Sequence, residues 1–297
     1  MTGPILVTGG NGQLASALTT SAASGTVRRV GRPDFDFDRP ETIEAAFRTA
    51  APHLVVNAAA YTAVDAAETD VDAAYRANRD GPAILARLCA EADIPLIHVS
   101  TDYVFDGTKP DPYTEADPVA PQGVYGASKL AGEQAVMAAG GKAIILRTAW
   151  VYAATGKNFV RTMLTVGKTR DRLTVVADQF GCPTTAVDLS DAILAIAVRL
   201  RATGWQPAYH GIFHAAGSGA TTWFGLAAAT FEEAGRHGAK VPDLAPIATA
   251  DWPTPAKRPA NSRLDCTRLH DVFGIRLPQW RDSLTRTVET IFATAPP

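Results

Sequence analysis

The sequence predicts an α/β fold in which a doubly wound parallel sheet is joined to a smaller C-terminal lobe. Three observations support this prediction. Short apolar runs alternate with helical patterns through the first half of the chain. The runs are apolar throughout, which is typical of strands buried on both faces. After residue 147 the alternation weakens, and proline and glycine interrupt the chain more often. We therefore expect one domain over residues 1–150 and a lobe over 151–297, with later segments able to return to the first domain.

Each element is predicted from its own pattern. Short apolar runs predict strands at residues 5–7, 27–30, 54–57, 96–100 and 143–147. Apolar residues recurring every three or four positions predict helices. These helices lie at 14–21, 43–49, 73–91 and 127–139, and in the second half at 188–201, 223–233 and 280–292. Because parallel strands need long crossovers, this alternation favours a parallel sheet with helices on both faces.

Charge and cysteine content exclude several classes of function. The 297 residues carry a formal net charge of -2, so nothing attracts the chain generally to nucleic acid or an anionic membrane. The three cysteines are far apart and lack a CxxC spacing, which argues against a structural zinc site and a disulfide framework. We expect no metal, and we expect a cytoplasmic protein, because the apolar run at 5–7 is too short for a signal peptide.

A glycine-rich loop follows the first strand. Its sequence is Thr8-Gly9-Gly10-Asn11-Gly12-Gln13-Leu14-Ala15. Glycines let a backbone approach a ligand closely, and the N-terminus of the following helix offers free N–H groups to a pyrophosphate. A bare strand-to-helix turn also uses glycine, but the position at the first βαβ unit favours a Rossmann-type dinucleotide site.

The end of the second strand bears on the choice between NADPH and NADH. Arg32 could pair with a 2′-phosphate, whereas Asp34, Asp36 or Asp38 could bond a ribose 2′-hydroxyl. Any one of these side chains could equally be a solvated loop charge. These residues do not decide between NADPH and NADH.

Two segments carry the expected chemistry. Thr101 and Asp102 follow the fourth strand, and Tyr125 and Lys129 lie four residues apart at the start of a helix. That spacing places the phenol and the ammonium on one helical face. A nearby cation favours a phenolate, so Tyr125 could donate a proton to a ketone oxygen that Thr101 holds. The spacing alone arises often by chance, and its order after a phosphate loop gives it weight.

These motifs resemble those of an extended short-chain dehydrogenase/reductase, and within that group the dTDP-4-dehydrorhamnose reductase family. The resemblance runs nearly end to end. Its landmarks include Val56-Asn-Ala-Ala-Ala-Tyr-Thr62, Ser100-Thr-Asp-Tyr-Val-Phe105, Asp178-Gln-Phe-Gly-Cys-Pro-Thr184 and Lys257-Arg-Pro-Ala-Asn261. Ala15 replaces the last glycine of the phosphate loop, and Cys182 occupies a position often held by a small residue. Neither departure blocks the chemistry.

The resemblance implies a role for each motif. It implies reduction of a dTDP-linked 4-keto sugar by NADPH or NADH, with Tyr125 as the proton donor, Lys129 beside it and Thr101 steadying the oxygen. Substrate contacts are implied for Asp102, Trp150, Arg258 and Asn261, and we also expect one from Tyr103. Cofactor contacts are implied for Gly12, Gln13, Leu14, Asp36, Phe37, Ala58, Ala59, Ala60 and Tyr61, as well as for Tyr125 and Lys129. From the loop and the end of the second strand we add Gly9, Asn11 and Arg32 to the expected cofactor contacts. The assembly we expect is a homodimer.

Three alternatives bear on the function. Related dehydratases place a glutamate after the Thr-Asp pair, and Tyr103 stands there in this chain, which favours plain reduction. A regulatory subunit, as some relatives are for methionine adenosyltransferase, could lack the Tyr-Lys pair, which is intact here. A reductase of another dTDP-4-keto sugar, such as a streptose or antibiotic-sugar precursor, stays open.

Overall fold

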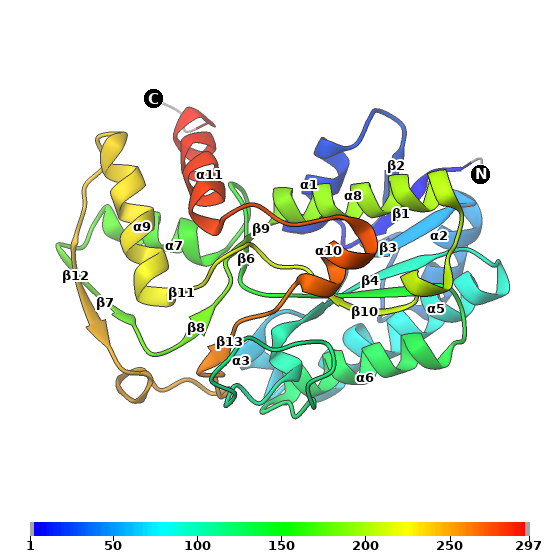
Figure 1. Ribbon diagram of the computed structural model, residues 1–297, viewed down its shortest axis with the longest axis horizontal. Coiled ribbons are helices and arrows are strands. Elements are labelled where there is room, and N and C mark those ends of the chain that lie inside the picture. Colours follow the sequence, from blue (N-terminus) through cyan, green and yellow to red (C-terminus); the bar gives the residue numbers. More distant parts are fainter. Residues whose placement is uncertain (1–2, 295–297) are drawn as a thin grey trace.

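The centre of the protein is a six-stranded parallel sheet, seen in a computed structural model that describes residues 3–294 (Figure 1). The strand order is β10-β5-β4-β3-β1-β2. The strands are β1 (Ile5–Thr8), β2 (Val27–Arg29), β3 (Leu54–Asn57), β4 (Leu96–Thr101), β5 (Ala143–Thr148) and β10 (Gly211–His214). The doubly wound parallel sheet predicted from the sequence is confirmed. The sixth strand, β10, was not expected, because it lies beyond the regular alternation.

Helices cover both faces of this sheet (Figure 1). One face packs against α1 (Gln13–Ser21), α8 (Ala186–Thr203) and α10 (Thr267–Phe273). The other packs against α2 (Pro40–Ala50), α5 (Gly81–Glu91) and α6 (Val124–Ala138). In β1, Ile5 and Val7 belong to the first core and Leu6 to the second. Burying such a side chain stabilises the fold by about 1.5–3 kcal/mol, which explains why the strand is apolar throughout.

The long helix expected over 73–91 contains a local widening. It consists of α4 (Val71–Tyr75), the π-helical turn η1 (Arg76–Asp80) and α5. Such turns occur often at functional sites. This one carries the buried side chain of Asn78 toward the expected cofactor segment. The short helix α3 (Val64–Ala67) precedes it.

The second half of the chain builds a smaller lobe at the left of Figure 1. A small core joins Tyr152, Val160, Leu226 and Leu284 from four of its segments. Its elements are β6 (Val151–Tyr152), α7 (Phe159–Gly167), β7 (Arg172–Val176), β8 (Phe180–Gly181), β9 (Thr184–Thr185), β11 (Thr221–Thr222), α9 (Trp223–Arg236), β12 (Asp243–Ile247), the short helix η4 (Thr249–Asp251), β13 (Asn261–Ser262) and α11 (Trp280–Thr294). The helices expected at 188–201, 223–233 and 280–292 are confirmed as α8, α9 and α11.

The two halves of the chain interleave. Helix α8 packs on α1, and β10 pairs with β5, so both return from the second half to the large sheet. The division into domains at residue 150 stays a prediction, and residues 295–297 of the expected lobe lie outside the described part. Among residues 3–294, no helix combines the length and the apolar character needed to cross a membrane.

Candidate active site

The expected site residues gather at the carboxyl edge of the sheet. Gly9 follows β1, Asn57 ends β3, Thr101 ends β4, and Trp150 stands two residues after β5. Ligands of open α/β sheets bind at this edge, because the strand-to-helix loops there enclose a crevice. The structure thus brings together motifs from four strands that are separate in sequence.

The glycine loop has the close backbone packing that a dinucleotide phosphate site requires. Gly9 and Gly10 adopt φ values of +106° and +52°, which favour glycine. A Cβ on Gly31 would lie 2.4 Å from the Cα of Gly10, so the loop and the end of β2 touch through bare backbone. Helix α1 then begins at Gln13 without a side-chain cap, leaving its first N–H groups free for an anion. These residues fit a pyrophosphate.

The segment from Ala58 to Tyr61 is fixed by Asn78, which was not predicted from the sequence. Its Oδ1 accepts a hydrogen bond from Tyr61 N at 2.8 Å, and its Nδ2 donates to Tyr61 O and to Ser128 Oγ. Ser128 lies on α6, so one side chain connects the expected cofactor segment with the helix that carries Tyr125. A buried polar residue inside an apolar helical pattern was the available signal.

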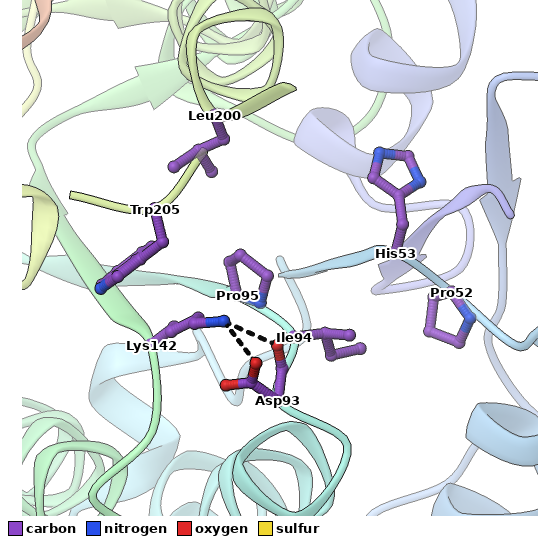
Figure 2. A pocket seen from close by; sticks show the side chains of 8 residues that line it. All are labelled: Pro52, His53, Asp93, Ile94, Pro95, Lys142, Leu200 and Trp205. Atoms are coloured by element: carbon purple, nitrogen blue, oxygen red, sulfur yellow. Dashed lines mark hydrogen bonds and ion pairs between the residues drawn. The ribbon is translucent and has the colours of Figure 1, made fainter. Parts of the chain in front are cut away.

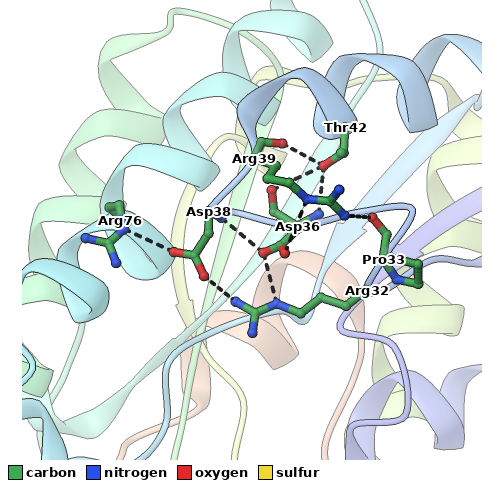
Figure 3. Close-up of polar contacts among 7 residues, drawn as sticks. All are labelled: Arg32, Pro33, Asp36, Asp38, Arg39, Thr42 and Arg76. Atoms are coloured by element: carbon green, nitrogen blue, oxygen red, sulfur yellow. Dashed lines mark hydrogen bonds and ion pairs between the residues drawn. The ribbon is translucent and has the colours of Figure 1, made fainter.

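Charged side chains cluster at the end of β2 (Figure 3). Arg32 Nε lies 2.9 Å from Asp36 Oδ1, and its Nη2 lies 2.6 Å from Asp38 Oδ2. Arg76 reaches the other oxygen of Asp38 at 3.0 Å, and Arg39 lies 3.8 Å from Asp36. Three cations therefore surround two carboxylates, and the Arg32 side chain is 69% exposed. Phe37 packs its ring over Gly81, where a Cβ would collide with it.

Thr101, Asp102 and Tyr125 form the polar centre of the site. Thr101 Oγ1 donates a hydrogen bond to Asp102 Oδ1 at 2.8 Å, and Asp102 Oδ2 is buried without a partner among the described residues. Burial raises the pKa of Asp102 to about 6, although hydrogen bonds from Ser262 and Thr101 oppose the shift. Burial raises the pKa of Tyr125 to about 12, and a hydrogen bond from Thr101 partly offsets this. The free protein therefore holds Tyr125 as a protonated phenol.

Lys129 lies one helical turn beyond Tyr125 and is 1% exposed. Its Nζ donates a 2.7 Å hydrogen bond to Val99 O of β4. Burial lowers the pKa of Lys129 to about 8, while the Glu133 carboxylate opposes the shift. The convergence of Lys129 and Tyr125 on one substrate stays a prediction.

A buried ion pair continues the same helical face beyond Lys129. Glu133 and Arg147 are each 2% exposed and joined by two hydrogen bonds, of 2.9 and 2.6 Å. Ser100 Oγ donates to the same Glu133 carboxylate at 2.5 Å. The bidentate geometry and the Ser100 hydroxyl satisfy both oxygens of Glu133, which a buried carboxylate needs, whereas Arg147 Nη1 is buried without a partner among the described residues. This pair, which was not predicted from the sequence, fixes α6 against β4 and β5.

The structure places the expected substrate residues in different environments. The rings of Tyr103 and Tyr125 meet edge to face with centroids 5.4 Å apart. Trp150 stacks on Trp223, with centroids 3.6 Å apart.

The two expected substrate residues of the late segment are held by polar contacts. Arg258 is paired with Asp65 at 2.7 Å. Asn261 is 7% exposed, and its amide bonds Lys109 O, Asp111 O and the Arg263 side chain. Its contact with substrate stays a prediction, since the amide already holds the loop at 109–111.

A separate cavity of about 340 Å³ lies at the opposite, amino edge of the sheet (Figure 2). Pro52 and His53 precede β3, Asp93 and Pro95 precede β4, and Lys142 precedes β5. Trp205 lines it from beyond α8. None of these residues belongs to the motifs above. In the described range 3–294, no three His, Cys, Asp or Glu side chains are grouped to hold a metal ion.

The parallel sheet, the phosphate loop and the Thr-Tyr-Lys set at its carboxyl edge define a short-chain dehydrogenase/reductase with an added lobe. Comparison with known proteins narrows the class. A model of the RmlD substrate binding domain matches residues 1–292. A dTDP-4-dehydrorhamnose reductase of Sinorhizobium fredii is 48% identical over 289 residues, which cover 96% of each chain. One of Escherichia coli is 41% identical over 261 residues, 87% of this chain and 86% of that protein. The chain belongs to the dTDP-4-dehydrorhamnose reductase family.

Solved structures agree with this assignment. A dTDP-4-dehydrorhamnose reductase of Clostridium acetobutylicum superposes with a TM-score of 0.89 at 36% identity, covering 97% of this chain and 99% of that one. The enzyme of Bacillus anthracis, solved in complex with NADP, gives a TM-score of 0.88 at 32% identity and covers 98% and 100% of the chains. The Rossmann-type fold expected from the sequence is confirmed.

Proposed function

We propose that this chain reduces the C4 keto group of dTDP-4-dehydrorhamnose to the alcohol of dTDP-L-rhamnose, using NADPH or NADH. The observation that carries the proposal is the protonated, half-buried Tyr125 beside Thr101 at the carboxyl edge of β4. Reduction needs a proton on the carbonyl oxygen, and this phenol can provide it. Family membership and the substrates named for the relatives support the choice of sugar.

The nicotinamide cofactor supplies the hydride for this reaction. The chain would hold its pyrophosphate at Gly9 to Gly12 and the N-terminus of α1, where backbone approaches backbone without intervening side chains. The segment from Ala58 to Tyr61, fixed by Asn78, borders the same crevice. Arg32 would meet the ribose end, and its exposure leaves it free to exchange Asp36 and Asp38 for a 2′-phosphate.

Side chains of this protein would deliver the proton to the carbonyl oxygen. Thr101, itself a donor to Asp102, would turn its hydroxyl to the carbonyl oxygen as negative charge develops there. Tyr125 then gives its proton to that oxygen and becomes a phenolate. Lys129, one turn away on α6, supplies the positive charge that stabilises this phenolate. Glu133 supports the charged state of Lys129, and Arg147 compensates the charge of Glu133.

The direct test is NAD(P)H oxidation, followed by absorbance, with freshly made dTDP-4-dehydrorhamnose. We expect rapid oxidation with dTDP-L-rhamnose as product, and a higher kcat/KM with one of the two nicotinamides. Binding of cofactor without oxidation would contradict the proposal. Turnover of a different dTDP-4-keto sugar would then favour the streptose or antibiotic-sugar alternative, and activity only in a partner's presence would favour a regulatory subunit. A homodimer and a cytoplasmic location remain our expectations.

A further inference from the structure

The backbone at Trp150 is unusual for a residue that is not glycine. Trp150 adopts φ +48° two residues after β5, at the carboxyl edge where Thr101 also lies. A bulky side chain in this region persists only where its surroundings hold the chain in place, and such residues cluster at functional sites. The residues that contact Trp150 therefore hold its backbone and its ring in this position.

Two segments of the smaller lobe enclose the Trp150 ring. The Trp223 ring stacks on it with an interplanar angle of 7° and a centroid separation of 3.6 Å. Gly181 lies so close that a Cβ there would approach the Cε2 atom of Trp150 to 2.3 Å. Gly181 is thus required because a side chain there would collide with the Trp150 indole, and not because its backbone conformation demands glycine.

Gln179, from the same segment, fixes the second indole. Its Oε1 accepts a hydrogen bond from Trp223 Nε1 at 3.2 Å, and its Nε2 donates to Thr249 Oγ1 at 3.0 Å. Gln179 is 6% exposed, so both ends of its amide depend on these partners. Asp178 in turn accepts hydrogen bonds from Thr249 N at 2.9 Å and from Thr249 Oγ1 at 2.6 Å.

We propose that Gln179 and Trp223 are positioning residues that set the Trp150 ring at the wall of the sugar site. The amide of Gln179 orients Trp223, and Trp223 orients Trp150 by stacking. This role deepens the proposed function and rests on it for the identity of the sugar.

The test uses Gln179→Leu, which keeps the size of the side chain and removes both hydrogen bonds, and Trp223→Phe. The protein's five tryptophans are labelled with 5-fluorotryptophan and followed by ¹⁹F NMR, with Trp150→Phe assigning the Trp150 signal. In Gln179→Leu we expect the Trp150 signal to move, because its distance from the Trp223 ring changes. The KM for dTDP-4-dehydrorhamnose should rise about tenfold, with kcat and cofactor Kd changed less than about twofold.

A double variant separates positioning from simple stability. If Gln179 acts through Trp223, adding Gln179→Leu to Trp223→Phe should raise KM by less than about twofold further. Trp205→Phe, at the opposite edge of the sheet, is the matched control and should change neither KM nor the Trp150 signal. The proposal would be overturned if the Trp150 signal did not move in Gln179→Leu. It would also be overturned if the rise in KM in the double variant equalled the product of the rises in the two single variants.

The two proposals fail in different ways. If the wild-type protein does not turn over dTDP-4-dehydrorhamnose, the proposed function is wrong. The Trp150 signal of Gln179→Leu still decides the positioning role in that case, since it needs no substrate. Should Gln179→Leu not fold, Trp223→Phe alone carries the test, with the same expected shift and rise in KM.

Discussion

The two edges of the central sheet use the same residue types in opposite ways. Lys129 at the carboxyl edge and Lys142 at the amino edge each donate a hydrogen bond to a backbone carbonyl at or near strand β4, Val99 O and Asp93 O. Lys129 is 1% exposed, whereas the Lys142 side chain is 27% exposed and pairs with the Asp93 carboxylate. Burial lowers the pKa of Lys129 to about 8. The difference shows that burial, and not hydrogen bonding, makes the first lysine chemically special.

The acidic partners differ in the same way. Glu133 is 2% exposed and bound at both oxygens, while the Asp93 side chain is 84% exposed. Solvent screens the pair at the amino edge, so its contribution is small. The amino edge has the cavity, whereas burial shifts the pKa values of Asp102, Tyr125 and Lys129 at the carboxyl edge. A cavity alone therefore does not locate the chemistry of this fold.

The largest effect should come from the proton donor. We expect Tyr125→Phe to lower kcat about 10³-fold, because we propose the phenol as the acid of the reaction. NADPH affinity should stay within about twofold, measured by fluorescence titration, since the phosphate loop is untouched. A variant that keeps wild-type turnover would remove Tyr125 from the mechanism.

The Glu133–Arg147 and Asp93–Lys142 ion pairs should contribute very differently to the free energy of unfolding. Glu133→Gln leaves Arg147 buried beside a neutral amide, and we expect it to lower the free energy of unfolding by about 3–5 kcal/mol. Asp93→Asn, its counterpart at the amino edge, should cost about 0–1 kcal/mol. Urea denaturation of both variants provides the measurement. Equal losses would contradict the contrast between the edges.

The two lysines should differ in activity. Lys129→Met should lower kcat about 10²-fold, because the phenolate loses its cation. Lys142→Met makes the same substitution at the opposite edge of the sheet and should leave kcat/KM within about twofold. Steady-state assays at pH 7 compare them directly. If both variants kept full activity, the assignment of Lys129 would be wrong.

The activity should also decline at high pH. The Lys129 pKa of about 8 means that the ammonium is present below that pH and is lost as the pH rises through it. Above this point log(kcat/KM), which reports the pKa values of the free protein, should fall toward a slope of −1, about tenfold per pH unit. Arginine stays charged over this range, so Lys129→Arg should remove the decline even if its overall activity is low. A pH profile of kcat/KM that is flat up to pH 9.5 would exclude this role.

The smallest effect should arise at the exposed cluster in Figure 3, which resembles the amino-edge pair in its exposure. Arg32→Ala should raise the KM for NADPH by about fivefold and leave that for NADH within about twofold, because only the 2′-phosphate can replace Asp36 and Asp38 as its partner. Parallel titrations with both nicotinamides measure the ratio. Equal changes for both would show that Arg32 does not contact the 2′-phosphate.

Local sequence was enough to predict the phosphate loop and most elements of the large sheet. A strand followed by glycines and a helix specifies its own geometry, as the positive φ values of Gly9 and Gly10 confirm. The four-residue spacing of Tyr125 and Lys129 places them on one face wherever that helix packs. Strand β10 was missed because its four residues, Gly211–His214, follow a helix of the second half and give only a weak pattern.

The sequence by itself thus determined the fold class and which residue types follow each strand of the sheet, because these depend on periodicity and on neighbours along the chain. Tertiary structure decided which groups meet. Arg258 pairs with Asp65 across 193 positions, Gln179 bonds Thr249 across 70, and Asn78 bonds Ser128 across 50. Tertiary structure also shifted the ionisation of the site, since burial raises the pKa of Asp102 and lowers that of Lys129. Burial and long-range pairing arise only when distant segments pack, so no local pattern could have specified them.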